Sequence, residues 1–401
     1  MEKIIINQSE VMMRLAIEKK DLLAHIQHLV SIVPSKNVTP ILNNYLIEVS
    51  EETNMMRIST TDLTLTVVVE FPAAVSEGGT IAVSAHHFNE IINYMPDAVI
   101  NLWQHDDLLM IQSGKVDFNL LIADHTLFPV IPEPKINYPI TVDAALFNRM
   151  ISKTYFAVST DVNRAILTGV CWKIYPTYHM MVATDGRKVA EIKVLNSSLL
   201  PSLENNDNQG LSILTEQNEV YVEKVIPLKT LLFLQKIFSE DVKELKVSME
   251  HNRIMFLYGE YFVSSQVFEH KYPEYQKAFP TELPNKFVID KESLITAIKR
   301  VALIAPDENF RIHFDIDNDR FEVNTTNRDT GDAKQNMDDY VYAGTSTGIS
   351  FNYKYMLSIL EAIDTEKVVI KLGSSKDPMM IYNENPIPDQ EITFLLMPLR
   401  S

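Results

Sequence analysis

The sequence repeats one ordered set of cues three times, at intervals of roughly 130 residues, and this constrains the fold more than any other feature. Each copy starts with a short strand-like stretch that runs directly into an amphipathic helix, at 16–26, 142–151 and 289–298. A Thr-rich turn follows in each copy, at 60–62, 184–186 and 325–327, and then a second helix, at 84–92, 227–234 and 351–359. Each copy closes on an apolar or aromatic residue and a proline, at Pro129, Pro273 and Pro398. Four cues in one order predict three copies of one domain.

Between the helices the apolar residues alternate with polar ones, as in half-buried antiparallel strands. We therefore expect an α+β fold, in which each domain packs two helices on antiparallel sheets with about eight strands. Clusters of proline at 131–139 and 279–284 mark domain boundaries. The predicted parts are an N-terminal extension, 1–12, and domains at 13–137, 138–282 and 283–401. Residues 196–211 are predicted to form a flexible polar loop, and residues 328–338 a similar polar insertion.

Composition excludes several classes of protein. The 401 residues, 46% of them hydrophobic, suffice to bury several cores, and no apolar run reaches 18 residues. The N-terminus lacks a secretion signal, and the only cysteine, Cys171, predicts a buried core thiol in a reducing cytoplasm. With 11 glycines, the chain has no GxGxxG or GxxxxGK loop, and it also lacks GxSxG, HExxH and CxxC. We expect neither an enzyme nor a cofactor.

The distribution of charge is more informative than its sum. The formal charge of −17 argues against nucleic-acid binding, because affinity for phosphate comes mainly from Lys and Arg. The expected helix segments, however, hold ten basic and seven acidic residues, which leaves −20 for the rest of the chain. These segments are 16–33, 84–95, 142–157, 226–239, 290–301 and 351–361. If they share a surface, that surface is mildly basic on an acidic body; the alternative is ordinary solvated helix faces.

Few residues suggest chemistry. His25 and His28 lie three apart on one expected helix without an obvious third metal ligand, and His86 and His87 point in different directions. Asp62 and Asp185 occupy matching turns, where Asp commonly accepts hydrogen bonds from its own backbone. A metal-dependent phosphoesterase that uses Asp62 or Asp185 with His86 or His87 is the enzymatic alternative. The prediction is no metal site.

Five stretches together resemble a known family. They are Thr39-Pro-Ile-Leu-Asn-Asn-Tyr-Leu, Val162-Asn-Arg-Ala-Ile-Leu-Thr-Gly-Val, Ala183-Thr-Asp-Gly-Arg-Lys-Val-Ala, Lys271-Tyr-Pro-Glu-Tyr-Gln and Leu396-Met-Pro-Leu-Arg-Ser. Across nearly the whole chain the sequence is similar to the bacterial replicative sliding clamp, the beta subunit of DNA polymerase III. Twelve residues precede Met13, where the family usually starts, so that Met1, Met12 and Met13 all stay open as the initiator.

The resemblance implies a fold and a function. Family members are head-to-tail homodimeric rings of six similar domains, so this chain would form half of such a ring. The ring is loaded onto primed double-stranded DNA in the cytoplasm and tethers partners without catalysis or a cofactor. Those partners are the DNA polymerase III catalytic subunit, the clamp loader, and other replication and repair proteins, including ligase; no membrane is involved. The alternative is a paralogue that acts as a partner-binding scaffold without encircling DNA.

The resemblance also implies site residues. Lys36 and Lys229 match positions that touch DNA, and the placement of helices adds Lys20, Arg149 and Lys299. The dimer interface would bring Phe118 and Leu120 of one copy against Leu303 and Ile304 of the other. A partner-peptide pocket would be lined by Arg164, Leu167, Thr184, Gly186, Arg187, Lys188, Val189, Pro273, Lys277, Ala278, Leu395, Met397, Pro398, Leu399 and Arg400.

The expected pocket departs from the family's usual sequence at several positions. Arg187-Lys188-Val189 stands where the family usually has His-Arg-Leu, and Ala278 and Ser401 replace larger apolar residues. Leu, Val, Pro and Met would still make an adaptable apolar cleft, with Thr and Arg holding the ligand's backbone. The departures leave the depth of the pocket and the preferred partner motif open.

Overall fold

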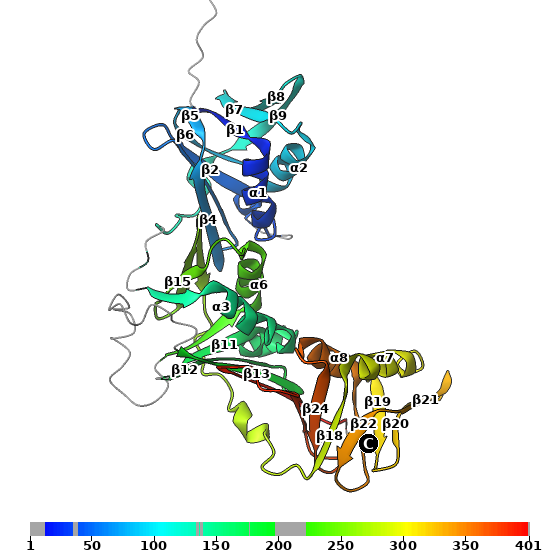
Figure 1. Cartoon of the computed structure of the whole chain (residues 1–401). Coiled ribbons are helices and arrows are strands. Elements are labelled where there is room, and N and C mark those ends of the chain that lie inside the picture. The colour runs from blue at the N-terminus through cyan, green and yellow to red at the C-terminus, as the bar shows by residue number, and fades with distance from the viewer. Residues whose placement is uncertain are drawn as a thin grey trace, which may run out of the picture. The chain divides into compact units, whose positions relative to one another are not determined.

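The computed structural model of the chain describes residues 13–34, 39–133, 136, 139–175, 177–196 and 222–399 (Figure 1). The chain divides into two compact units. Among the described residues, the first comprises those in 13–144 and 232–267, and the second those in 145–196, 222–231 and 268–399. The predicted extension, 1–12, and all of the predicted loop 196–211 except Asn196 lie outside the described residues. The three-domain division stays a prediction.

The first unit is built on one thirteen-stranded antiparallel sheet, in the order β10-β15-β16-β17-β4-β3-β2-β6-β9-β8-β7-β1-β5. Its strands are β1 (Arg14–Glu18), β2 (Asn44–Ser50), β3 (Met55–Thr61), β4 (Leu65–Pro72), β5 (Ala74–Glu77), β6 (Gly79–Ser84), β7 (Val99–His105), β8 (Leu108–Ser113), β9 (Val116–Ala123), β10 (Ile140–Asp143), β15 (Glu244–Met249), β16 (Arg253–Tyr258) and β17 (Tyr261–Gln266). The helices α1 (Lys19–Leu29) and α2 (Ala85–Tyr94) lie side by side in this unit.

The core of the first unit forms because each helix buries one apolar stripe. In α1 the buried side chains Leu22, Ile26 and Leu29 recur at helical spacing, and in α2 Phe88 and Ile92 do the same. Full burial of one such side chain stabilises the fold by about 1.5–3 kcal/mol. This stripe holds the helices on the sheet and leaves their polar faces in solvent.

The second unit contains two antiparallel sheets. The larger has nine strands in the order β14-β11-β12-β13-β26-β25-β24-β18-β22, and the smaller has four in the order β21-β20-β19-β23. These strands are β11 (Gly169–Ile174), β12 (Tyr178–Thr184), β13 (Lys188–Leu195), β14 (Val222–Pro227), β18 (Asn285–Asp290), β19 (Arg311–Ile316), β20 (Phe321–Asn327), β21 (Gly331–Met337), β22 (Tyr340–Ala343), β23 (Thr347–Asn352), β24 (Lys367–Leu372), β25 (Met379–Asn383) and β26 (Gln390–Leu396). Helices α7 (Lys291–Val301) and α8 (Tyr353–Ala362) contact each other here.

Two helices extend across the division between the units. In α3 (Ala144–Ser152) only the first residue belongs to the first unit, and α6 (Leu228–Ile237) divides after Leu231. Short 3₁₀ helices occupy Pro40–Asn43, His125–Leu127, Tyr155–Ala157, Val162–Thr168 and Tyr275–Ala278. Among the described residues, no helix is long and apolar enough to cross a membrane.

The repeated strand-into-helix pattern is confirmed. All six α-helices that the structure describes begin at the residue directly after a strand: β1 into α1, β6 into α2, β10 into α3, β14 into α6, β18 into α7 and β23 into α8. In two of them a side chain caps the first turn. Asp290 Oδ1 accepts the Ser293 N–H at 2.7 Å, and Asn352 Oδ1 accepts the Lys354 N–H at 2.9 Å. Such caps satisfy backbone donors that the first helical turn leaves unpaired.

The prediction of a polar loop at 328–338 is wrong. Residues 331–337 form β21, which pairs along its length with β20, from Asn327 opposite Gly331 to Phe321 opposite Met337. Its side chains are mostly exposed, because the strand lies at the edge of the four-stranded sheet. An edge strand needs no continuous apolar run, so polarity alone did not distinguish it from a loop.

Candidate functional site

A cavity of about 160 Å³ opens in the second unit beside the turn that joins β12 to β13. Its walls come from the 3₁₀ helix Val162–Thr168, the β12–β13 turn, the segment 273–278 and the end of β26. The lining residues are Leu167, Thr184, Gly186, Arg187, Lys188, Val189, Pro273, Glu274, Tyr275, Ala278, Leu395 and Met397. An apolar cavity of about 150 Å³ admits one benzene-sized ring. This cavity therefore has room for one branched or aromatic side chain.

The turn beside the cavity is fixed by two side-chain oxygens. Asp185 Oδ1 accepts the backbone N–H groups of Arg187 at 2.8 Å and Lys188 at 3.0 Å. Thr184 Oγ1 accepts the Gly186 N–H at 3.0 Å and donates to the Lys188 carbonyl at 2.6 Å. Gly186 has φ of +84°, in the left-handed region that glycine adopts without strain. The backbone that lines the cavity is held in place before any ligand binds.

The prediction that the matching turns are capped by their own side chains is confirmed. Asp62 Oδ1 accepts the N–H groups of Thr64 at 2.9 Å and Leu65 at 2.7 Å. In the third copy Asn327 Oδ1 accepts the Asp329 N–H at 3.0 Å. Hydrogen bonds of this kind are the usual task of Asp and Asn in turns.

Two tyrosines attach the 272–278 wall to the sheet. The Tyr272 hydroxyl accepts the Thr184 N–H at 3.0 Å, and the Tyr272 N–H donates to Glu223 Oε1 at 2.9 Å. The Tyr275 hydroxyl donates to the buried Glu191 carboxylate. Burial, and then the negative charge of Glu191, raises the pKa of Tyr275 well above its ordinary value. The hydroxyl therefore stays protonated and remains a donor.

The chain after β26 forms the opposite wall. Lys188 of β13 lies opposite Leu396 of β26, and the next N–H, of Met397, donates to the Arg187 carbonyl at 2.8 Å. The Leu399 N–H donates to the Ser350 carbonyl at 2.8 Å. Backbone hydrogen bonds therefore hold this segment in place on both sides of Pro398.

The cations near the cavity differ in availability. Lys188 Nζ lies 3.2 Å from Asp185 Oδ2, with both side chains almost buried, and 4.1 Å from the centre of the Tyr355 ring. Lys277 pairs with Glu274 at 2.6 Å, but its side chain is 82% exposed, so this pair adds little stability. Lys188 supports the wall, whereas Lys277 can reach a ligand.

The structure brings ten of the fifteen predicted pocket residues to this cavity. Arg164 lies behind it and donates from Nη1 to the Asp185 carbonyl at 2.9 Å. Lys277, Pro398 and Leu399 are near in sequence but do not line it, and Arg400 lies outside the described residues. Peptide binding in the cavity stays a prediction.

Two lining residues, Glu274 and Tyr275, were missed by the sequence analysis. Both lie inside the stretch Lys271-Tyr-Pro-Glu-Tyr-Gln, which was recognised as a motif but from which only Pro273 was assigned to the pocket. The signal was a pair of tyrosines on either side of a proline in an otherwise polar segment, a combination typical of a segment that packs on an apolar surface.

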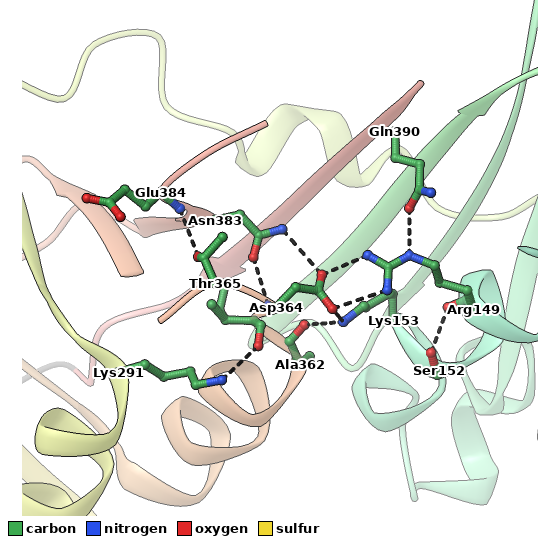
Figure 2. A network of polar contacts seen from close by, with 11 residues as sticks. Arg149, Ser152, Lys153, Lys291, Ala362, Asp364, Thr365, Asn383, Glu384 and Gln390 are labelled. Atoms are coloured by element: carbon green, nitrogen blue, oxygen red, sulfur yellow. Dashed lines mark hydrogen bonds and ion pairs between the residues drawn. The ribbon is translucent and has the colours of Figure 1, made fainter. Parts of the chain in front are cut away.

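Arg149, predicted to face DNA, is bound within the second unit (Figure 2). Its Nη2 and Nη1 donate to the two carboxylate oxygens of Asp364 at 2.8 and 3.1 Å, and its Nε donates to Gln390 Oε1 at 2.6 Å. Lys153 Nζ donates to Asp364 Oδ1 and to the Ala362 carbonyl, both at 2.6 Å. The network ties α3 to the loop after α8 and to β26.

The pKa shifts in this network follow from burial and pairing. Burial would raise the pKa of Asp364, but hydrogen bonds from Arg149 and Lys153 outweigh it, and the pKa is lowered. For Lys153 the balance is reversed: burial lowers its pKa more than Asp364 raises it. The carboxylate is therefore charged at neutral pH and holds Arg149 in place.

The other predicted DNA contacts are exposed where they are described. Lys20 of α1, Lys229 of α6 and Lys299 of α7 all present their side chains to solvent. Lys36 lies outside the described residues. Their role in DNA binding stays a prediction.

The predicted interface residues are also accessible. Phe118, on β9, is 41% exposed, and Leu303, just after α7, is 84% exposed. Leu120 and Ile304 are half-buried. Large apolar side chains with this exposure suit a surface that another protein covers.

Comparison with known proteins identifies the family. Residues 13–132 match the N-terminal domain of the DNA polymerase III beta subunit, and residues 276–400 match its C-terminal domain. The chain belongs to the DNA polymerase III beta subunit family. Members of this family are the sliding clamps of DNA replication, so the resemblance found in the sequence is confirmed.

The clamp relatives match over nearly the full length. The beta sliding clamp of Synechococcus elongatus is 26% identical and covers 92% of this chain and 94% of that protein. The Staphylococcus aureus clamp is also 26% identical, with 97% and 100% covered. The solved structure of the C. crescentus beta sliding clamp superimposes with a TM-score of 0.84 at 25% identity, covering 97% of this chain and 100% of that one. The clamp from Bacillus subtilis gives 0.85 at 23% identity, covering 97% and 99%.

Family membership also answers the enzymatic alternative. The sliding clamp is a non-catalytic processivity factor, so this chain is not an enzyme. The two aspartates of that alternative accept hydrogen bonds from their own turns. No group of three side chains that could hold a metal ion occurs among the described residues. His25 stacks on Phe71 at 4.3 Å and lies 3.4 Å from Glu260, while burial lowers its pKa.

Proposed function

We propose that two copies of this clamp-family chain close into a ring around duplex DNA, and that the cavity beside the β12–β13 turn tethers replication and repair proteins to it. The geometry of the cavity is the observation that carries the proposal. Apolar walls, a rigid turn and room for one side chain suit a short linear motif presented by a partner. Holding a polymerase in this way confers processivity.

The proposed partners share one recognition chemistry. An apolar anchor side chain enters the cavity, and the ligand's backbone is held at the rim by exposed polar groups such as Lys277. The DNA polymerase III catalytic subunit, the clamp loader and other replication or repair proteins would compete for the site. Because Ala278 offers only one methyl group, the cavity suits a larger anchor than a bulkier residue there would allow.

DNA contact in this proposal is weak and non-specific. A closed ring holds DNA by topology, so its inner surface needs only scattered cations; strong attraction to phosphate would oppose sliding. Lys20, Lys229 and Lys299, together with Lys36, supply these charges. Arg149 is left out because three of its five guanidinium N–H donors already bind Asp364 and Gln390.

Three domains at 13–137, 138–282 and 283–401, doubled in the homodimer, would give the ring six similar parts. The interface joins Phe118 and Leu120 of one copy to Leu303 and Ile304 of the other. Leu303→Glu should therefore yield monomers in sedimentation, because it places a charge in an apolar contact. Leu127→Glu, which charges another exposed leucine of the chain, is the matched control and should remain a dimer.

Loader-dependent retention on circular DNA tests the whole proposal. The protein should stay on a nicked circular plasmid through gel filtration and should be lost after the plasmid is cut once. Retention on linear DNA would indicate ordinary electrostatic binding and contradict a topological clamp. Peptide binding without retention on circles would favour the scaffold alternative.

A further inference from the structure

We infer that a second cavity, formed where β25 and β26 separate, binds a basic side chain of the same partner protein whose apolar anchor enters the first cavity, beside the β12–β13 turn. The inference rests on the proposed tethering function and adds a second contact to it. Three features of the described residues carry it: the enclosed volume, the charge of its lining and its position on β26.

The second cavity lies at the end of a β-hairpin whose strands separate early. The ladder between β25 and β26 ends at Ile381 opposite Phe394, and the next pairing along the hairpin is the bridge between Ile387 and Gln390. Residues 382–387 and 390–392 line a cavity of about 230 Å³ there. Since about 150 Å³ admits a benzene-sized ring, this volume has room for one long side chain.

The network around Asp364 holds two walls of the second cavity in place (Figure 2). Arg149 Nε donates to Gln390 Oε1 at 2.6 Å, and Asn383 Oδ1 accepts the Asp364 N–H at 2.9 Å. Arg149 also binds both carboxylate oxygens of Asp364, so its own charge is compensated. The walls are therefore positioned before a ligand binds, which lowers the entropic cost of binding.

Two carboxylates give the second cavity its charge. Glu384 and Glu391 belong to the lining, and none of its described residues is basic. The Glu384 N–H donates to Thr365 Oγ1 at 3.0 Å, whereas its carboxylate points away from the network and has no partner within the part of the chain that the structure describes. A lining of this charge favours a cationic ligand over an anionic one.

Glu391 keeps part of its charge although a lysine lies beside it. Its Oε2 is 3.2 Å from Lys193 Nζ, and the same Nζ is 3.6 Å from Glu191 Oε1. One ammonium group is therefore shared by two carboxylates. Lys371 lies over the Tyr382 ring, 5.4 Å from its centre, and does not line the cavity. The Glu391 side chain is 66% exposed, so a ligand can reach it.

The uncharged part of the lining suits the stem of a long basic side chain. Pro386 and Ile387 of the hairpin and Ile392 of β26 supply apolar atoms. Arg and Lys bury their methylene stems on such surfaces while the charged head stays at a polar rim. The same glutamates would repel the phosphates of a nucleic acid. The chemistry therefore indicates a protein ligand rather than DNA.

The position on β26 connects the two cavities. Glu391 lines the second and Leu395 lines the first. The two residues lie four apart on one strand, so their side chains point to the same face of the sheet, about 14 Å from each other. An extended peptide spans this distance in about four to five residues. One partner segment can therefore occupy both cavities, and each contact raises its effective concentration at the other.

Peptide binding to the full-length chain tests the inference. Each labelled peptide carries an apolar clamp motif and, about four to eight residues away on either side, an arginine or its uncharged isostere citrulline. In fluorescence polarisation at low salt, at least one arginine peptide should bind about fivefold tighter than its citrulline counterpart. The difference should fall below about twofold at high salt, because ions screen partly exposed ion pairs.

Variants locate the source of this preference. Glu384→Gln, Glu391→Gln should abolish the difference between the two peptides and leave the affinity of the citrulline peptide unchanged. Glu51→Gln, Glu52→Gln removes two exposed carboxylates from the first unit and is the matched control. The control variant should keep the preference for arginine, because it changes the net charge equally without touching the cavity.

Each outcome has a defined meaning. Absence of an arginine preference at every placement, with citrulline peptides still bound, overturns the second contact and leaves the proposed function intact. A preference that persists in the Glu384→Gln, Glu391→Gln variant also overturns it, because the arginine then binds elsewhere. A wild-type chain that binds none of the peptides instead overturns the tethering function itself.

Cysteine trapping checks the position of the ligand. A peptide with cysteine in place of the arginine should form a disulfide with Asn385→Cys, in the lining of the second cavity, at least about tenfold faster than with Asn318→Cys, an exposed site in the same unit. The sole native cysteine, Cys171, is buried and gives no background. Equal rates at the two sites would overturn the placement.

Discussion

The turn at 61–65 and the turn at 184–188 are built alike but sit in different surroundings. In both, an Asp side chain accepts the N–H groups two and three residues later, and the preceding Thr hydroxyl accepts one N–H and donates to one carbonyl. The residue after the Asp has a positive φ in each: 75° at Leu63 and 84° at Gly186. The same backbone device recurs in the two units.

The difference lies in what packs beside the two turns. The first is covered by β17, where the Gln266 N–H donates to the Thr64 carbonyl at 2.8 Å. The second carries Tyr272 on its Thr184 N–H and borders the cavity with Gly186. A repeated turn thus supplies rigidity in both places, and only its neighbours create a cavity beside one of them.

The largest expected effect comes from filling the second turn. Gly186→Val should weaken binding of a clamp-motif peptide about 100-fold, or about 3 kcal/mol, because a β-branched residue is strained at positive φ and its Cβ would lie 3.3 Å from Arg164 Nη1, which displaces the turn that borders the cavity. Fluorescence polarisation with a labelled peptide measures this. Leu63→Val, the matched change in the first turn, should leave peptide affinity unchanged. Wild-type affinity of Gly186→Val would show that the turn does not border the binding site.

Acid should lower the free energy of unfolding because of His179, which lies on β12, the strand that leads into the second turn. This ring is fully buried with no hydrogen-bond partner, and burial lowers its pKa from 6.5 to about 3. Below pH 6.5 the unfolded chain binds a proton that the folded chain refuses until about pH 3, so stability falls as pH falls through this window.

At pH 4.5 the loss should be about 2–3 kcal/mol relative to pH 7. Thermal unfolding monitored across pH 7 to 4.5 measures it, and His179→Leu should flatten that part of the profile. β3, which leads into the first turn, has no histidine. A His179→Leu profile as steep as that of the wild type would assign the acid sensitivity to other groups.

Removing the caps sharpens the comparison. Asp62→Ala and Asp185→Ala each lose two backbone hydrogen bonds and should each lower the free energy of unfolding by about 1–2 kcal/mol. Only Asp185→Ala should also reduce peptide affinity, about fivefold, because only its turn lines the cavity. Asp→Asn at each site keeps an acceptor oxygen and serves as the control. Equal effects of the two alanine variants on peptide affinity would contradict this difference.

The smallest effect concerns the strained leucine. Leu63→Gly should raise stability by about 0.5–1 kcal/mol in chemical denaturation, because glycine relieves the left-handed strain at this mostly exposed position. Leu63→Asn, which tolerates the same conformation, should give part of that gain. A loss of stability in both variants would mean that the Leu63 side chain contributes contacts worth more than the strain.

Local patterns predicted much of this architecture. The strand-to-helix junctions at 16–26, 142–151 and 289–298 and the Asp-capped turns depend on periodicity and on side chains that bond to their own backbone, so they could be predicted from short stretches. β21 was missed because an edge strand of Gly, Asp, Lys, Gln and Asn lacks the apolar alternation that marks half-buried strands.

Long-range pairing could not be predicted in the same way. Arg149 looked like a free cation on a helix, but its partner Asp364 lies 215 residues away. Nothing in either local sequence indicates this pair. The pocket residues, by contrast, were predicted from motifs that the chain shares with its family, while Tyr275 was missed although it lies within one of those motifs.

The polar edge of β21 has a consequence for the newly made chain. An open sheet edge can pair with any extended polypeptide in a crowded cell. Asp, Lys, Gln and Asn along that edge disfavour pairing with the apolar strands that start aggregation. The newly made chain can therefore leave this edge uncovered without aggregating.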